Sequence, residues 1–131
     1  MIIHTPERQC LLLERLRPGG FWQSVTGTMR WDEAPVKTAA REVHEETGLD
    51  ADGLVDAHVQ RRFPILPEWR DRYSQDVTEN LEHLWFLPVR KVCPITLNAE
   101  EHSAYRWLEL EEAIVSVTSW TNREALERLR A

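Results

Sequence analysis

Residues 27–49, which read GTMRWDEAPVKTAAREVHEETGL, constrain the fold more than any other segment of this chain. Pro35 suits the first position of a helix, because its fixed φ fits there and its missing N–H would have no partner. Gly48 suits the position just after a helix, where a left-handed residue closes the last turn. The segment therefore predicts a short amphipathic helix from about Pro35 to Thr47.

Two faces of this helix differ in character. At about 100° per residue, the stripe expected to face the core comprises Val36, Ala40, Val43 and Thr47. The carboxylates of Glu42, Glu45 and Glu46 gather on a different face, because residues three and four positions apart are neighbours on a helix. Like charges at this spacing repel, so a cation should compensate them, and Mg²⁺ is usually held by a few carboxylates and substrate phosphates. The alternative is a solvated acidic helix with an Arg41–Glu45 pair.

The same segment carries fixed residue types at fixed spacing, G-x5-E-x7-R-E-V-x-E-E-x-G-L. The positions are Gly27, Glu33, Arg41, Glu42, Val43, Glu45, Glu46, Gly48 and Leu49. This pattern resembles the Nudix box, the signature of hydrolases that cleave diphosphates linked to another moiety, and every position matches. The resemblance implies the Nudix fold, an α/β (α+β) domain with a mixed β-sheet sandwiched between α-helices.

The whole chain has 131 residues, enough for a real core, so we expect residues 1–131 to form a single domain. Its net charge of −6 argues against a general nucleic-acid binder, which would carry a basic footprint. Cys10 and Cys93 make no disulfide framework and fit buried thiols in a reducing compartment. No apolar run approaches the ~20 residues of a membrane span. We expect a cytoplasmic monomer or homodimer with no nucleic-acid or membrane partner.

The remaining segments read as short strands and small helices. Strands are expected over residues 1–3, 10–16, 21–25, 54–62, 81–90 and 104–108. A small helix is expected from about Glu111 to Val115, and Asn122 is expected to cap a last helix. The buried stripe of that helix comprises Ala125, Leu126 and Leu129. Phe63 to Asn80 has no clean period and is expected to form a long loop, which in a compact domain is usually functional or disordered.

Segments that flank the box resemble one branch of the family. They are FWQSVTG at 21–27, R-x-R-Y and V-T-x-N within 70–80, E-H-x-A-Y-x-W-L at 101–108 and S-W-x-N-R at 119–123. Together they are similar to the dihydroneopterin triphosphate diphosphatases of bacterial folate biosynthesis. Two departures stand out: the family usually begins with a longer first strand, and Ala34 replaces the usual Ser or Thr helix cap. The second departure costs about 1 kcal/mol of local stability.

This resemblance implies hydrolysis of dihydroneopterin triphosphate to dihydroneopterin monophosphate and pyrophosphate, with Mg²⁺, or alternatively Mn²⁺, as cofactor. The partner is then a small phosphorylated substrate. One alternative is a Nudix hydrolase of (deoxy)nucleoside triphosphates or dinucleoside polyphosphates. Another is a non-catalytic module that binds a ligand, but such modules often lose box carboxylates and this chain keeps them all.

The resemblance also assigns roles to single residues. The expected metal ligands are Glu42, Glu45, Glu46 and Glu101, and the expected catalytic residues are Glu45, Glu101 and Arg41. Glu101 matches a position that supplies a further ligand or the general base, with Glu100 as the alternative. Arg41 is expected to orient Glu33 or Glu45. His102 is a weaker candidate for the general base and is expected instead to pack or hydrogen-bond locally.

Substrate contacts are expected from several separate parts of the chain. The candidates are Arg15, Thr26, Phe63, Pro64, Ile65, Leu66, Ser119, Trp120 and Asn122. Arg15 offers a planar fork that suits phosphate oxygens, although it also reads as a surface arginine that ends a strand. Trp120 could stack on a pterin ring or pack in the core, and the amide of Asn122 could hydrogen-bond the ring. The loop residues Arg70, Arg72 and Tyr73 could close over the phosphates.

Overall fold

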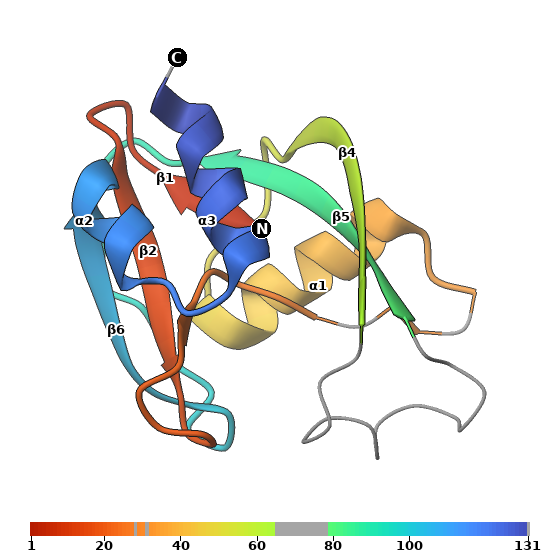
Figure 1. Cartoon of the computed structure of the whole chain (residues 1–131), viewed down its shortest axis with the longest axis horizontal. Helices are drawn as coiled ribbons and strands as arrows, with labels where there is room; N and C mark the ends of the chain where they lie inside the picture. The colour runs from red at the N-terminus through yellow and green to blue at the C-terminus, as the bar shows by residue number, and fades with distance from the viewer. Residues whose placement is uncertain (28, 31, 65–78, 131) are drawn as a thin grey trace.

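The computed structural model describes residues 1–27, 29–30, 32–64 and 79–130, with the backbone alone over 61–64 and 79–82. Within these ranges it contains strands, three α-helices and a 3₁₀ turn (Figure 1). The strands are β1 (Ile2–His4), β2 (Gln9–Arg15), β3 (Trp22–Gln23), β4 (Val55–Pro64), β5 (Glu79–Pro88) and β6 (His102–Glu109). The helices are α1 (Pro35–Thr47), α2 (Leu110–Ser116), α3 (Trp120–Glu127) and the 3₁₀ turn η2 (Arg128–Arg130).

The strands form one mixed sheet in the order β3-β2-β1-β5-β4, and β6 pairs with β2. β1 and β5 are parallel, whereas the other pairs are antiparallel. Gln23 of β3 lies opposite Leu13 of β2, and His102 of β6 lies opposite Arg15. The end of β3 and the start of β6 therefore flank the same end of β2.

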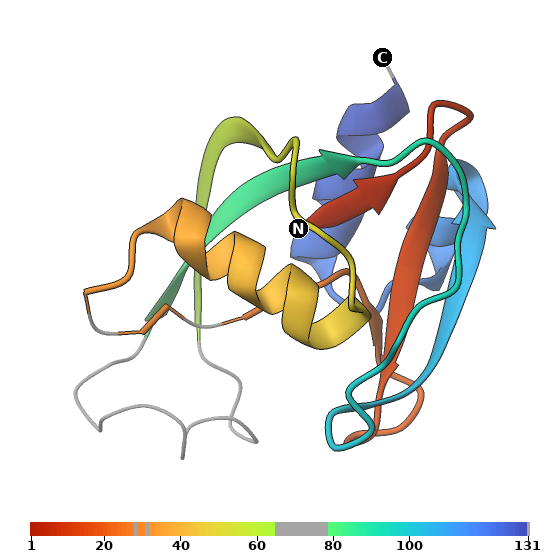
Figure 2. The ribbon, with the colours of Figure 1, turned by 180° about the vertical axis from the view of Figure 1, so that it is seen from behind.

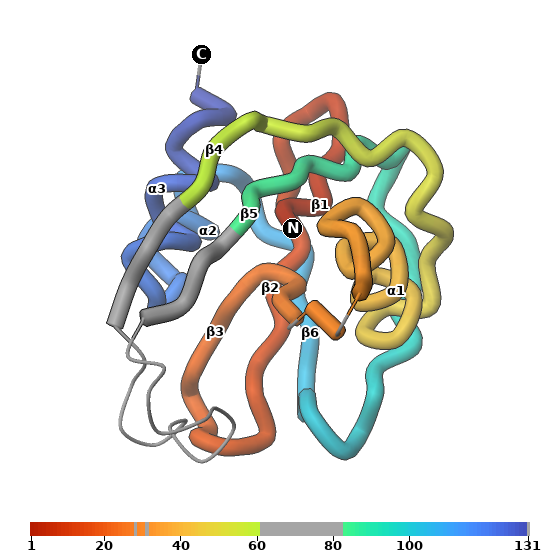
Figure 3. Tube along the Cα trace, turned by 90° about the vertical axis from the view of Figure 1, so that its right-hand side faces the viewer, coloured from red at the N-terminus to blue at the C-terminus, as the bar shows by residue number. Residues whose placement is uncertain are grey.

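Helices cover both faces of this sheet. Successive residues of a strand point to opposite faces, so β2 contributes to two hydrophobic clusters. Leu12 belongs to the cluster that contains Ala113 of α2 and Leu126 of α3, whereas Leu11 belongs to the cluster that contains Val43 of α1. Figures 2 and 3 show α1 on one side of the sheet and α2 and α3 on the other. The expected α+β sandwich is confirmed.

The ends of α1 follow the local sequence signals. The helix spans the predicted residues, Pro35–Thr47, and Gly48 closes it with φ 75° while its N–H donates to the carbonyl of His44. Ala34 precedes the helix and makes no capping hydrogen bond, because its methyl group has no acceptor. Among the helices in the described ranges, none has the length and apolar character needed to cross a membrane.

The buried face of α1 differs from the predicted stripe. Val36 is 43% exposed and Ala40 is half-buried, so the first half of that stripe was wrong. The buried residues of the helix are Thr38, Ala39, Val43, Glu46 and Thr47. Glu46 lies three residues after Val43, on the same side of the helix, and therefore enters the interior with it. Apolar character alone had placed this carboxylate on the opposite face.

Two further expectations need correction. The ladder between β4 and β5 pairs Phe63 with Asn80 and Pro64 with Glu79, so both ends of the expected loop belong to strands. Cross-strand pairing extends the strands through residues whose own pattern is irregular. Residues 65–78 of that loop, which include Ile65 and Leu66 and the arginines and tyrosine of the R-x-R-Y pattern, lie outside the described residues. Asn122 is not a helix cap, because the position before α3 is held by Ser119.

Candidate metal centre and active site

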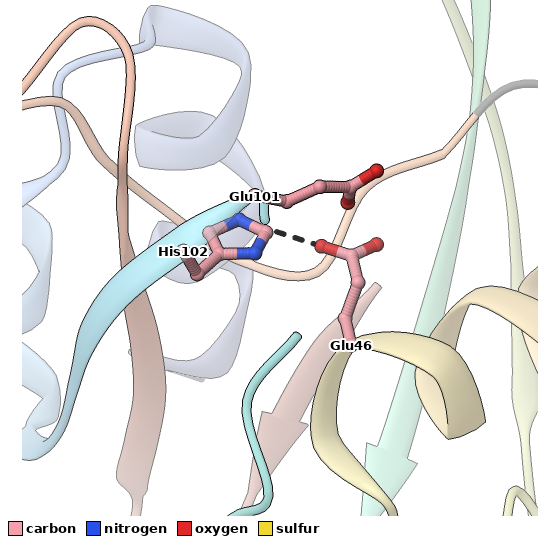
Figure 4. Close-up of side chains that lie close together, drawn as sticks. All are labelled: Glu46, Glu101 and His102. Atoms are coloured by element: carbon pink, nitrogen blue, oxygen red, sulfur yellow. Dashed lines mark ion pairs between the residues drawn. The ribbon is translucent and has the colours of Figure 1, made fainter. Parts of the chain in front are cut away.

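A buried group of ligand atoms lies where α1 meets the start of β6 (Figure 4). Glu46 and His102 are 1% and 3% exposed, and Glu101 reaches the group from the surface. One ligand atom from each of these residues lies within 4.8 Å of the others. Nε2 of His102 lies 3.5 Å from Oε1 of Glu46. A single cation can bridge atoms at this spacing.

Electrostatics favour a cation at this place. Burial, followed by the nearby carboxyl groups of Glu42 and Glu101, raises the pKa of Glu46 to about 10. Burial and the charge of Arg15 lower the pKa of His102 to about 4. Without a cation, both side chains are then uncharged near neutral pH. Oε2 of Glu46 receives no hydrogen bond from a donor group of the described residues, and the carboxyl of Glu42 lies beside this side chain. Buried carboxylates are either paired or coordinate a metal. The group therefore fits a divalent cation.

Arg41 fastens the loop before α1 onto the acidic face of the helix. Its Nε and Nη2 each donate to an oxygen of Glu33 at 2.8 Å. Its Nη1 donates to Glu42 at 2.7 Å and to Glu45 at 3.4 Å. The hydrogen bonds from Arg41, followed by one from the N–H of Arg30 and one from the hydroxyl of Thr38, hold the pKa of Glu33 well below its ordinary value. Arg41 thus contacts both partners predicted for it, and Glu42 as well.

The four predicted metal ligands occupy different environments. Glu46 and Glu101 belong to the buried group, and the carboxyl of Glu42 lies close enough to Glu46 to affect its pKa. The side chain of Glu45 is 44% exposed and pairs with Arg41 and, at 3.7 Å, with Arg30. Glu45 therefore lies at the outer edge of the site.

Gly27 lies directly against this site. A Cβ atom at its position would overlap Cγ and Cδ of Glu42, whose carboxylate is already fixed by Arg41. Only glycine allows the backbone to approach the carboxylate this closely. Thr26, next to it, is half-buried, and its hydroxyl lies 3.3 Å from Nε2 of Gln23.

The remaining substrate candidates are spread over the sheet edge and the helices. Arg15 ends β2, donates from Nε to the carbonyl of Arg17 and lies near enough to His102 to lower its pKa. Trp120 is 50% exposed, so the core-packing alternative for it was wrong. The hydroxyls of Ser119 and Thr121 lie 2.8 Å apart. Phe63 and Pro64 belong to β4, and their side chains are not described.

Asn122 ties α3 to the segment that leads from β3 into the site. Its Oδ1 accepts from the N–H of Ser24 at 2.6 Å and from the hydroxyl of Ser24 at 3.0 Å. Both residues are buried. Two hydrogen bonds between Trp22 and Thr118 strengthen the same connection. The N–H of Trp22 donates to the hydroxyl of Thr118, and the N–H of Thr118 donates to the carbonyl of Trp22. Asn122 therefore has a structural partner that the sequence did not reveal.

We expect Asn122→Ala to lower the free energy of unfolding by about 1–3 kcal/mol, because the buried N–H of Ser24 would lose its acceptor. Asn122→Asp keeps an oxygen at the same place and should lose much less. Urea unfolding of the three proteins compares them directly. Equal stability of the alanine variant and the unchanged chain would contradict this account of the contact.

Among the residues at the site, sequence reasoning missed Gln23 and gave His102 only as a weaker candidate for the general base. His102 was expected to bond locally, yet it lies within the buried group, and Gln23 contacts it from β3. Residues 101 and 102 should point to opposite faces of a regular strand. The register of β2 and β6 shifts between Glu14 and Arg15, opposite the start of β6, where that regularity breaks. The one available signal was the position of His102 directly after the candidate Glu101.

Comparison with known proteins identifies the family. A family model described as the NUDIX domain matches residues 1–129. This chain belongs to the NUDIX family. As a NUDIX hydrolase it is an enzyme, as the complete box predicted, and enzymes of this family generally use a divalent metal.

Similar proteins cover nearly the whole NUDIX chain. It is 35% identical to the dihydroneopterin triphosphate diphosphatase of Haemophilus influenzae, over 98% of this chain and 83% of that protein. It is 37% identical to the protein of the same name from Escherichia coli, over 92% of this chain and 82% of the relative. The solved structure of the E. coli dihydroneopterin triphosphate pyrophosphohydrolase superimposes with a TM-score of 0.91 at 34% identity, covering 97% of this chain and 89% of that one.

Proposed function

We propose that this NUDIX hydrolase cleaves dihydroneopterin triphosphate into dihydroneopterin monophosphate and pyrophosphate, with Mg²⁺ as its cation and Mn²⁺ as the alternative. The observation that carries the proposal is the 35–37% identity to two dihydroneopterin triphosphate diphosphatases over more than nine-tenths of this chain. The segments that flank the box, which are part of the same similarity, agree with it. A cytoplasmic location and a monomeric or homodimeric state remain predictions.

The residues at the junction of α1 and β6 divide into two proposed roles. Glu46 and Glu101 would hold the cation, with Glu42 beside them and Glu45 at the outer edge. A bound Mg²⁺ neutralises phosphate oxygens and lowers the pKa of a water molecule. Glu101 is exposed, so its carboxylate can also accept a proton from the attacking water. Arg41 would keep Glu42 and Glu45 in place, and Arg15 would bind phosphate oxygens.

Recognition of the pterin ring would fall to Trp120 more than to Asn122. Trp120 is 50% exposed, and an exposed tryptophan can stack on an aromatic ligand. The carbonyl oxygen of Asn122 already accepts two hydrogen bonds from Ser24, and the hydroxyl of Ser119 is paired with Thr121. Stacking on one exposed ring is therefore the contact that these side chains offer most readily.

Substrate profiling tests the proposal. We expect kcat/KM for dihydroneopterin triphosphate to exceed that for dATP, GTP and diadenosine tetraphosphate by at least about tenfold, with pyrophosphate released. Trp120→Ala should reduce this advantage several-fold and Trp120→Phe should keep it, since an aromatic contact contributes about 0.5–1.5 kcal/mol. Product analysis by ³¹P NMR distinguishes pyrophosphate from stepwise loss of phosphate. A preference for any of the nucleotides would overturn the pterin assignment.

A further inference from the structure

His102 lies between two other buried side chains that come from different elements. Gln23 of β3, His102 of β6 and Glu46 of α1 are 4%, 3% and 1% exposed. Nε2 of His102 lies 3.4 Å from the amide of Gln23. The same nitrogen lies 3.5 Å from Oε1 of Glu46, the pair that Figure 4 marks with a dashed line. In the described part of the chain, the imidazole therefore links the glutamine to the carboxylate.

The partners of the ring decide which nitrogen carries its hydrogen. Nδ1 of His102 is buried and has no hydrogen-bond partner among the described residues. A hydrogen on Nδ1 would leave a buried N–H unsatisfied and would point the lone pair of Nε2 at a carboxylate oxygen. A hydrogen on Nε2 donates toward Oε1 of Glu46 and leaves only a lone pair on Nδ1. The second tautomer is therefore the favourable one when Glu46 is ionised.

Gln23 can support this tautomer. In the structure the amide nitrogen of Gln23 faces both Nε2 of His102 and the hydroxyl of Thr26. The oxygen and nitrogen of an amide occupy nearly equivalent positions, so exchanging them turns the oxygen toward Nε2–H of His102, which then shares its hydrogen between Gln23 and Glu46. The same oxygen can accept from the hydroxyl of Thr26, which lies 3.3 Å from that end of the amide. Gln23 would then fix the plane of the imidazole ring through a contact from the neighbouring strand.

The two oxygens of Glu46 therefore have different surroundings. Oε1 faces the imidazole, whereas Oε2 has no hydrogen-bond partner in the described chain. Mg²⁺ is a hard cation that selects oxygen over imidazole nitrogen. Groups that hydrogen-bond to a metal-binding side chain commonly set its orientation and its affinity for the metal.

We propose that His102 is a positioning residue whose Nε2–H orients the Glu46 carboxylate toward the cation, with Gln23 fixing the imidazole. This inference rests on the proposed metal site and does not depend on the substrate. It assigns to the histidine a role in metal affinity, with no direct bond to the metal. The amide and the imidazole together would select the carboxylate rotamer that aims Oε2 at the ion.

A calorimetric titration of the full chain with Mg²⁺ alone tests the proposal. We expect His102→Leu to weaken Mg²⁺ binding by about 10- to 100-fold. His102→Gln should stay within about threefold, because its amide N–H reaches close to the position of Nε2. His4→Leu is the control, since it removes an imidazole of β1 that packs edge-on against Phe86 of β5. Unchanged Mg²⁺ affinity in a folded His102→Leu protein would overturn the proposal.

Two spectroscopic readouts on the unsubstituted protein keep the test decisive even where the leucine variant fails to fold. In ¹⁵N-histidine NMR of the Mg²⁺-loaded protein, Nε2 of His102 should carry the hydrogen, and a hydrogen on Nδ1 would contradict the proposal. In the Mn²⁺-loaded protein, pulsed EPR should find no directly bonded nitrogen, and a bonded nitrogen would make His102 a ligand instead. Neither readout uses a substrate, so a nucleotide preference would leave this inference standing.

Discussion

Replacing Glu46 with glutamine should lower Mg²⁺-dependent kcat/KM by at least about a hundredfold, which corresponds to about 2.7 kcal/mol of transition-state stabilisation. The substitution keeps the size of the side chain but removes the charge that the cation would neutralise. Glu46 is 1% exposed and its Oε2 has no partner in the described chain, so we expect its loss to affect the metal more than the fold. Pyrophosphate release measured against Mg²⁺ concentration checks the result. Unchanged turnover would contradict the metal role.

The same substitution should change how stability depends on pH. In the metal-free protein the pKa of Glu46 is raised from 4.5 to about 10. Above about pH 6.5 the unfolded chain has released a proton that the folded chain keeps until about pH 10, so the free energy of unfolding falls as pH rises, by up to about 1.4 kcal/mol per unit. Between pH 4.5 and 6.5 the lowered pKa of His102 has the opposite effect on stability and offsets this slope. Below pH 4.5 this penalty is absent. Glu46→Gln should remove the slope, so the metal-free variant should be the more stable protein at pH 8.

Mg²⁺ provides a second arm of that experiment. Because the cation competes with the proton on Glu46, it should raise the melting temperature more at pH 8 than at pH 5. The glutamine variant should lose most of this difference. Glu112→Gln, on the exposed side of α2, is the matched control and should keep both the slope and the response to Mg²⁺. A control that lost the response as well would point to general electrostatics instead of the site.

The sequence predicted α1 to the residue because its end signals are local. Pro35 sets the start through its own backbone, and Gly48 sets the end through its left-handed φ. The chemistry of the Nudix box is local for the same reason, since its carboxylates share one helix. Such signals do not depend on what the helix packs against.

What the sequence could not predict depends on contacts between distant segments. Glu46 was placed on the polar face because hydropathy treats every carboxylate as exposed, whereas a metal site requires a buried one. The contact of Gln23 with His102 spans 79 residues, and that of Ser24 with Asn122 spans 98. No periodicity reports on such pairs. The strand ends at Pro64 and Glu79 likewise follow from mutual pairing, since neither residue favours a strand by itself.

Gly27→Ala should reduce kcat by roughly a hundredfold while the fold persists, because a displacement of about 1 Å at a catalytic group can cost that much. The added methyl group would overlap the side chain of Glu42, and Arg41 holds that carboxylate at 2.7 Å. The carboxylate cannot yield without leaving its arginine, so either Glu42 or the loop before α1 must move. Steady-state kinetics and Mg²⁺ titration of the variant measure the effect.

A double-mutant cycle shows whether Glu42 transmits the effect of Gly27→Ala. In a Glu42→Ala background the three atoms that lie nearest to the methyl group are gone, so Gly27→Ala should there have little further effect on Mg²⁺ affinity or on unfolding. Gly19→Ala is the matched control, because nothing lies within 4 Å of its added Cβ, and it should leave activity unchanged. Equal losses from Gly27→Ala in both backgrounds would show that the glycine acts through its own backbone. The close approach to Glu42 would then not be the reason that this position requires glycine.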